Sequence, residues 1–305
     1  ALNIDPSDAI VASTGVIGQV LPIEPIEETA PLLASSLKGD GSELAARAIM
    51  TTDTVVKEAA AEFTVGGKTV RLGGICKGSG MIHPNMCTML CFLTTDAAIA
   101  APVLDKALRG VVAETFNMVS IDGDTSTNDT ITVMANGLAE NPEIQADTPE
   151  YEEFTQALRA ICTDLARKMA KDGEGATKLL VCKVTGAANL ADARTVAKSV
   201  ICSSLLKAAM FGADANWGRV LCAIGYAGTN TDVNRVDVSF RSKAGTIDVC
   251  KNGAGIPFSE EKAKEILTQD EIDILVTLGD GDASAEAYGC DLTYDYVKIN
   301  GDYRT

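Results

Sequence analysis

One long amphipathic segment constrains the fold more than any other part of the sequence. Thr148 is a good helix N-cap, Pro149 suits the first helical turn, and acidic residues follow it. Apolar side chains then recur three or four residues apart and form a single stripe: Phe154, Leu158, Ile161, Leu165 and Met169. The sequence therefore predicts a helix from Pro149 to about Asp172 that ends at Gly173 and buries this stripe in the core.

Several strands are predicted around this helix. The alternation over Val55–Val70, with Gly66-Gly67 as its tight turn, predicts a hairpin. Apolar, β-prone runs predict buried strands over Thr88–Thr94 and Thr177–Val184. Shorter patterns predict a buried strand over Ile10–Ser13 and strand-like structure over Asp291–Asn300.

Further helices and loops complete the pattern. Helices are expected over Glu43–Met50, over Asp192–Phe211 with its end at Gly212, and after the cap Ser259. Residues 73–80 are rich in glycine and are expected to form a loop. Strands and helices mixed with hairpins favour an α+β sandwich over a doubly wound parallel sheet.

Charge and cysteine content exclude several classes of protein. The chain has 305 residues, 46% of them hydrophobic, and a formal net charge of −16, which argues against binding nucleic acid or an anionic membrane surface. No uncharged apolar run reaches the roughly 18 residues that a membrane span needs. Nine cysteines, an odd number without a CxxC pair, favour reduced thiols over a disulfide framework. We expect a cytoplasmic protein.

The single histidine narrows the chemistry. His83 alone cannot build a histidine-rich metal site, and only one Ser-His-Asp or Cys-His arrangement could be formed around it. The segment 122–133 begins like a calcium loop, but Thr127 stands where the loop needs glycine and Val133 where it needs glutamate. We therefore expect no metal, and a catalytic base other than imidazole.

Thr88 lies where a segment rich in glycine meets a predicted buried strand. Glycines and Pro84 precede Thr88, which opens a predicted buried strand and follows the small Cys87. If the backbone were cut between Cys87 and Thr88, the new terminal amine, with a pKa of about 7.7–8.0, could act as base for the threonine's own hydroxyl. A threonine that opens a strand is ordinarily just a strand residue, so this pattern alone leaves both interpretations open.

Seven motifs, in order along the chain, carry a resemblance to a known family. They are STGVIG at 13–18, AIMTTDT at 48–54, KGSGMIHPNMCTML at 77–90, DGDTSTNDT at 122–130, DGEGATK at 172–178, ANWGRV at 215–220 and YVKINGDYRT at 296–305. Together they closely resemble the self-cleaving ornithine/glutamate N-acetyltransferases of arginine biosynthesis. Those enzymes move an acetyl group from N2-acetylornithine to glutamate, and some also use acetyl-CoA as donor.

The resemblance implies roles for individual residues. Thr88 corresponds to the nucleophile released by self-cleavage, and Cys87 stands where the family usually has alanine. Thr14 and Gly15 correspond to the oxyanion hole. The substrate contacts of the family map to Thr51, Lys77, Thr88, Glu174, Asn300 and Thr305.

Charge suggests how two of these contacts work. N2-acetylornithine carries a carboxylate and a free ammonium, so one cation and one anion can hold it. We assign Lys77 to the carboxylate and Glu174 to the ammonium. Asn300 and Thr305 imply that the C-terminus folds back over the site.

The resemblance also implies an architecture and an assembly. We expect a layered sandwich of the self-cleaving N-terminal-nucleophile type, with a second, C-terminal α/β lobe. The expected parts are 1–87, an α-chain part that lacks an upstream segment found in the family, 88–190, a catalytic core, and 191–305, a lobe whose tail returns to the site. The cleaved fragments would stay together, as α2β2, and work without a cofactor, acetyl-CoA being a co-substrate only.

Two alternative functions stay open at this point. A self-cleaving amidohydrolase or aminopeptidase would use the same threonine but pass the acyl group to water. A non-catalytic binding protein on the same scaffold would not cleave itself at all.

Overall fold

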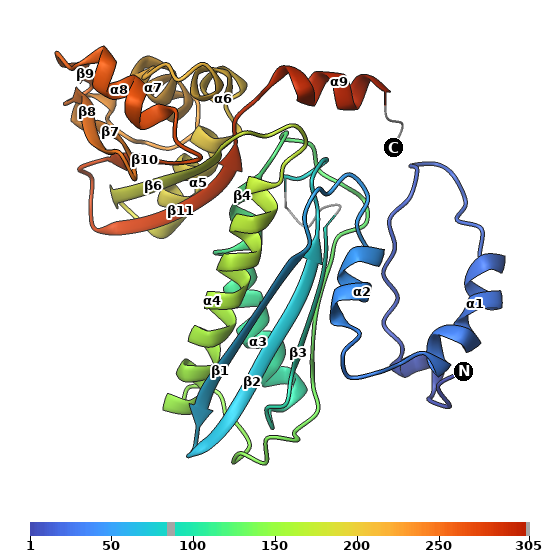
Figure 1. Ribbon diagram of the computed structural model, residues 1–305. Coiled ribbons are helices and arrows are strands. Elements are labelled where there is room, and N and C mark those ends of the chain that lie inside the picture. Colours follow the sequence, from blue (N-terminus) through green and yellow to red (C-terminus); the bar gives the residue numbers. More distant parts are fainter. Residues whose placement is uncertain (84–88, 303–305) are drawn as a thin grey trace.

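The computed structural model describes residues 1–83 and 89–302, which form two lobes, each built on its own sheet. In Figure 1 one sheet lies beside the long helix predicted from Pro149 in one lobe, and the second sheet lies with several helices in the other. The mixture of two sheets and covering helices confirms the predicted α+β class.

The first sheet has the order β1-β2-β3-β5 and begins with the predicted hairpin. Its strands are β1 (Lys57–Val65), β2 (Lys68–Lys77), β3 (Leu90–Thr95) and β5 (Thr130–Ala135). Gly66 and Gly67 both have positive φ, 56° and 79°, as a two-residue turn between twisted strands requires. β3 pairs antiparallel with β2 and parallel with β5.

The predicted loop over residues 73–80 is wrong for its first half, because β2 continues to Lys77. Gly73 and Gly74 pair with β1 on one side and with β3 on the other. A Cβ on Gly74 would lie 2.2 Å from Leu93 Cδ2, so this glycine serves close packing between strands instead of a turn.

The long helix is present where the stripe predicts it. α4 (Pro149–Lys171) starts at the N-cap Thr148, whose hydroxyl accepts a hydrogen bond from Tyr151 N, and it ends at Asp172. All five stripe residues are buried, and α4 packs on β1, β2 and the helix α3 (Ala101–Val112). Each such side chain contributes about 1.5–3 kcal/mol through burial.

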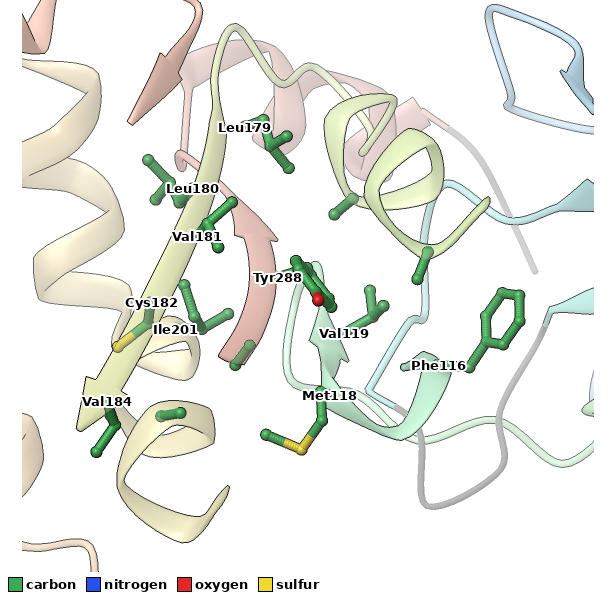
Figure 2. Packing of buried hydrophobic residues seen from close by; sticks show 14 of the residues in the cluster. Phe116, Met118, Val119, Leu179, Leu180, Val181, Cys182, Val184, Ile201 and Tyr288 are labelled. Atoms are coloured by element: carbon green, nitrogen blue, oxygen red, sulfur yellow. The ribbon is translucent and has the colours of Figure 1, made fainter. Parts of the chain in front are cut away.

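The second sheet is mixed and has the order β4-β11-β6-β10-β7-β8-β9. Its strands are β4 (Val119–Ser120), β6 (Leu179–Ala187), β7 (Asp237–Ser242), β8 (Gly245–Lys251), β9 (Ala254–Gly255), β10 (Glu271–Thr277) and β11 (Ala283–Cys290). The apolar run predicted as a strand forms the inner strand β6, and Figure 2 shows its side chains packed with Ile201 of α5 and Tyr288 of β11.

Most of the remaining helices pack on these sheets or on one another, but the first and the last of them bury no residue. They are α1 (Glu24–Ser35), α2 (Ser42–Ala48), α5 (Leu190–Cys202), α6 (Ser204–Phe211), α7 (Trp217–Gly225), α8 (Glu260–Leu267) and α9 (Tyr294–Asp302), with short 3₁₀ turns at Pro6–Asp8, Phe116–Met118 and Val233–Arg235. α2 and the Ser259-capped α8 confirm two predicted helices. Among the described residues, no helix combines the length and the apolar surface that crossing a bilayer requires.

Three further predicted elements are wrong. The helix expected over Asp192–Phe211 is two helices, because Ser203 is extended (φ −66°, ψ 106°) and its hydroxyl caps α6 by accepting Leu206 N. Residues 10–13 form no strand and Val11 is 86% exposed, since no described strand lies beside them to pair with. The C-terminal tail is the helix α9 instead of a strand.

Candidate active site

Most of the predicted site residues line one cavity of about 390 Å³. Six of them, from five separate parts of the chain, lie in its wall: Thr14, Gly15, Thr51, Lys77, Glu174 and Asn300. These parts are the N-terminal loop, the loop after α2, the end of β2, the loop after α4 and the helix α9. In Figure 1, α9 extends from the second lobe toward the N-terminal segment.

Lys77, the last residue of β2, supplies the positive charge of the cavity. Its side chain is buried, and Nζ donates a 3.1 Å hydrogen bond to Thr51 Oγ1. Burial lowers the pKa of Lys77, although the nearby carboxylates of Asp53 and Glu174 oppose this effect. An ammonium has three N–H donors, so Lys77 can bind an anion in the cavity while it keeps its bond to Thr51.

Glu174 supplies the negative charge and is held by backbone and side-chain contacts. Its N–H donates a 2.9 Å hydrogen bond to Ser79 O, and its Oε2 accepts a 2.7 Å bond from Asn300 Nδ2. A Cβ on Gly80 would lie 2.3 Å from Glu174 Oε1, so the missing side chain at position 80 leaves room for the carboxylate in its observed position. The cavity therefore presents fixed charges of both signs.

Thr14 and Gly15 reach the cavity on an irregular loop. They lie in the cavity wall, and a Cβ built on Gly15 meets no atom within 4 Å. A threonine hydroxyl and a backbone N–H on open loop residues are donors that can face developing negative charge.

Cys87, Thr88 and Thr305 lie outside the described residues. The nearest described residue to the predicted nucleophile is Met89, whose N–H donates a 2.8 Å hydrogen bond to Asp129 Oδ1. Leu90, which follows it, is the register partner of Lys77. The chain therefore resumes after residue 88 beside the strand that ends in the cavity's lysine.

Sequence reasoning missed a buried charge cluster next to the site. The Lys57 ammonium lies 2.6 Å from Asp53 Oδ1 and 2.5 Å from Asp172 Oδ2, and both the lysine and the Asp53 side chain are wholly buried. Asp53 also accepts hydrogen bonds from Gly78 N (2.8 Å) and Thr51 N (3.2 Å). Burial alone would raise the pKa of Asp53, but Lys57 and these hydrogen bonds hold it below its ordinary value.

This cluster positions two parts of the cavity wall. Through Asp53 it fixes the backbone of Thr51 and of the residue after Lys77. One signal in the sequence could have revealed it: Lys57 occupies an inward position at the start of an alternating strand, where an apolar residue is expected.

The segment 122–133, which begins like a calcium loop, instead supports the backbone beside the cavity. Asp122 accepts hydrogen bonds from Met81 N (2.6 Å) and Ile82 N (3.0 Å), and Met81 has a positive φ of 55°. The carboxylate thus supports a strained backbone next to the cavity. Within residues 1–83 and 89–302 no group of three His, Cys, Asp or Glu side chains could hold a metal ion.

The fold and the cavity define a two-lobed α+β protein that can bind a small molecule carrying both charges. The chain belongs to the ArgJ family, whose model matches residues 1–305. This match confirms the resemblance that the seven motifs indicate.

Curated relatives and a solved structure agree with this assignment. The arginine biosynthesis bifunctional protein ArgJ of Caldanaerobacter subterraneus subsp. tengcongensis is 51% identical over 304 residues, covering 100% of this chain and 75% of the relative. The protein of the same name from Bacillus subtilis strain 168 is 49% identical over 304 residues, 100% of this chain and 73% of the relative. The crystal structure of the arginine biosynthesis bifunctional protein argJ from Bacillus halodurans has a TM-score of 0.66 and 46% identity, covering 70% of this chain and 98% of that chain.

Proposed function

We propose that this chain is an acyltransferase of arginine biosynthesis that moves an acetyl group from N2-acetyl-L-ornithine to L-glutamate. The observation that carries the proposal is that Lys77 and Glu174 line the same cavity. Lys77 would bind the α-carboxylate of acetylornithine, and Glu174, oriented by Asn300, would bind its side-chain ammonium. A cavity of about 390 Å³ is large enough for one such amino acid, which suits a reaction with one substrate bound at a time.

The chemistry starts with a cut between Cys87 and Thr88. The freed amine of Thr88 takes the proton of its own hydroxyl, and the oxygen attacks the acetyl carbonyl. The Thr14 hydroxyl and the Gly15 N–H would stabilise the negative oxygen that forms, each by about 3–4 kcal/mol. The ammonium then protonates the departing amine of ornithine, and the amine of glutamate takes the acetyl group from Thr88 in the reverse sequence.

The pairing of β2 with β3 supports the view that both fragments stay together. These strands belong to different fragments after the cut, yet they pair over six positions, from Leu72 with Thr95 to Lys77 with Leu90. We infer an enzyme of intertwined fragments, assembled as α2β2 in the cytoplasm. Acetyl-CoA would enter only as a co-substrate, and no metal or organic cofactor is required.

Intact mass spectrometry combined with an acetyl-transfer assay tests the proposal. The natural protein should give two fragments that meet at the 87–88 bond, and acetylornithine should add one acetyl group to the fragment that begins with Thr88. Acetylglutamate should form when glutamate is added, whereas release of acetate alone would indicate a hydrolase. Thr88→Ala should stay uncut and inactive, and brisk acetyl transfer by this uncut variant would overturn the proposal.

A further inference from the structure

Glu174 has to accommodate two side chains of opposite charge if the proposed reaction takes place. Acetylornithine and the product acetylglutamate are both N2-acetyl amino acids, and each exchanges its acetyl group with the same nucleophile. Both α-carboxylates would therefore bind at Lys77, and both side chains would extend toward Glu174 in the same cavity. The ammonium nitrogen of ornithine and the carboxylate oxygens of glutamate each follow the δ-carbon, so they would occupy the same place.

The wall of this cavity carries more negative than positive charge. Among the described residues that line it, Lys77 is the one cation, whereas Asp122, Asp124 and Glu174 are carboxylic acids. Acetylornithine suits such a wall because its own two charges cancel. Glutamate brings a second carboxylate, and an ionised Glu174 should repel it.

The Glu174 carboxylate is held in the wall and is surrounded by groups that are already engaged. Its backbone N–H donates a 2.9 Å hydrogen bond to Ser79 O, and Oε2 accepts a 2.7 Å bond from Asn300 Nδ2. The same Asn300 amide nitrogen also donates to Tyr296 O at 3.1 Å, so both of its N–H groups are used. The Tyr296 hydroxyl is hydrogen-bonded to Asp122. These neighbours leave no donor for a second carboxylate beside Glu174.

One proton resolves the conflict between two carboxylates. When they share a site, they bind one proton between them, because its loss would place two like charges in contact. The O–H···O hydrogen bond that results is short and strong, since its acceptor is ionised. A pair of this kind takes up and releases its proton as a unit.

Building on the proposed function, we propose that Glu174 recognises both substrates: as a carboxylate it binds the ammonium of acetylornithine, and through one shared proton it binds the side-chain carboxylate of glutamate. The proton comes from solvent when glutamate binds and returns to solvent when acetylglutamate leaves. The overall reaction therefore consumes no proton at this step.

The charged groups around Glu174 act on the shared proton in both directions. Lys77, at the end of β2, favours its loss, because a cation stabilises the ionised form of a carboxyl group. Asp122 and Asp124, in the loop after β4, favour its retention. Tyr296 of α9 stays uncharged, since burial raises the pKa of its hydroxyl. Two carboxylates against one lysine favour a bound proton near neutral pH.

L-glutamate and L-glutamine, compared as acceptors, isolate this effect. Glutamine has the same shape but a neutral side chain, so it needs no shared proton. Both amino acids carry an α-amine and an α-carboxylate, so the titrations of these groups and of Lys77 cancel in the ratio of kcat/KM for glutamate to kcat/KM for glutamine. In a ping-pong reaction kcat/KM for the acceptor does not depend on the donor, so weaker binding of acetylornithine does not disturb this ratio.

The ratio is measured against pH for the natural protein, Glu174→Gln and Asp164→Asn. Asp164 is an exposed carboxylate on α4, paired with Lys168, and its removal controls for the loss of one negative charge. In the natural protein the ratio should fall about tenfold per pH unit from about pH 5.5 to 7.5, because each glutamate binds together with one proton. Asp164→Asn should show the same slope.

Glu174→Gln should have opposite effects on the two substrates. KM for acetylornithine rises, because the ammonium loses its anion, whereas the ratio for the acceptors becomes nearly independent of pH. At the upper end of the pH range the ratio should exceed that of the natural protein at least about tenfold, since the new amide donates an N–H to the glutamate carboxylate without a proton from solvent. Melting curves establish that the variant is folded.

Three outcomes would overturn this role of Glu174. They are a ratio that does not change with pH in the natural protein, an equal slope in Glu174→Gln, and a natural protein that uses glutamate but rejects glutamine at every pH. The first and third need no variant, so they decide even if Glu174→Gln does not fold. A natural protein that transfers acetyl groups from acetylornithine to neither acceptor contradicts the proposed function itself, whereas a flat ratio leaves that function standing.

Discussion

Asn300 Nδ2 donates a 2.7 Å hydrogen bond to Glu174 Oε2 and thereby joins the C-terminal helix to the loop after α4. A second bond between the same elements, from Thr293 Oγ1 to Gly175 O at 2.7 Å, lies near the start of α9. The orientation of the cavity's carboxylate therefore depends on a helix at the far end of the chain. Binding of a substrate ammonium at Glu174 should be sensitive to changes in α9 that leave the cores of both lobes intact.

Asn300→Asp should weaken acetylornithine binding without unfolding the protein. The new carboxylate would repel Glu174 instead of donating to it, and the loss of one charge-assisted hydrogen bond is worth about 1.5–3 kcal/mol, so KM should rise roughly 10- to 100-fold. Steady-state kinetics and a melting curve measure the two effects. Lys298→Ala, at an exposed position of the same helix, is the control, and an equal rise of KM in both variants would argue against a specific role for Asn300.

Removing either charge of the cavity should raise KM for acetylornithine. Lys77→Met leaves the carboxylate of the substrate without its cation, and Glu174→Gln leaves the ammonium of the substrate without its anion. Each loss should weaken binding by about 2 kcal/mol or more, which is roughly 30-fold in KM. The reversals Lys77→Glu and Glu174→Lys should have larger effects. If KM for acetylornithine is unchanged at both positions, the two-charge model of substrate binding is wrong.

The elements that the sequence predicts well are those fixed by local patterns. The apolar stripe from Phe154 to Met169 and the turn at Gly66-Gly67 each determine their own element, and both are present in the structure. The strand expected over 291–300 is wrong because the start of α9 combines a local cap with a contact to a distant loop. Its first turn is capped by Thr293, which accepts Tyr296 N while its hydroxyl donates to a loop 118 residues earlier in the chain.

The residues of the candidate site also fall into two groups: those that sequence motifs identify, and those that depend on contacts between distant segments. Motif resemblance named Lys77 and Glu174, and the structure brings both to one cavity. Lys57 was missed because its partner Asp172 is 115 residues away in the chain. Charges and registers that join distant segments leave only a weak trace in a single sequence, here an inward-facing lysine on an alternating strand.

The buried cluster predicts an unusual pH dependence for Lys57→Met. In the natural protein the pKa of Asp53 is held low, so this carboxylate adds stability above its unfolded value of 3.8 and loses it as pH falls through the folded value. Without Lys57, burial should raise the pKa of Asp53 in the folded state, and the sign reverses: stability is kept at low pH and lost as pH rises through the raised pKa.

Urea unfolding at pH 4.5 and pH 7 measures this reversal. Breaking a buried ion pair costs about 3–5 kcal/mol, and Lys57→Met should show this deficit at pH 7 and a smaller one at pH 4.5. Lys243→Met removes one exposed partner of Asp270 and should leave the free energy of unfolding close to that of the natural protein at both pH values. A deficit for Lys57→Met that is the same at both pH values would show that Asp53 does not titrate as this cluster requires.

The lowered pKa of Lys77 predicts an alkaline loss of substrate binding. A lysine is charged below its pKa, and burial brings that pKa below the ordinary value of 10.5, so Lys77 should lose its proton, and its hold on the substrate carboxylate, at a lower pH than an exposed lysine. KM for acetylornithine should therefore rise with pH before the side-chain ammonium of the substrate titrates. Lys77→Arg keeps its charge over this range and separates the two titrations, because only the substrate's own deprotonation should remain in its profile. Coincident KM profiles for the natural protein and Lys77→Arg would contradict the assignment of Lys77 to the carboxylate.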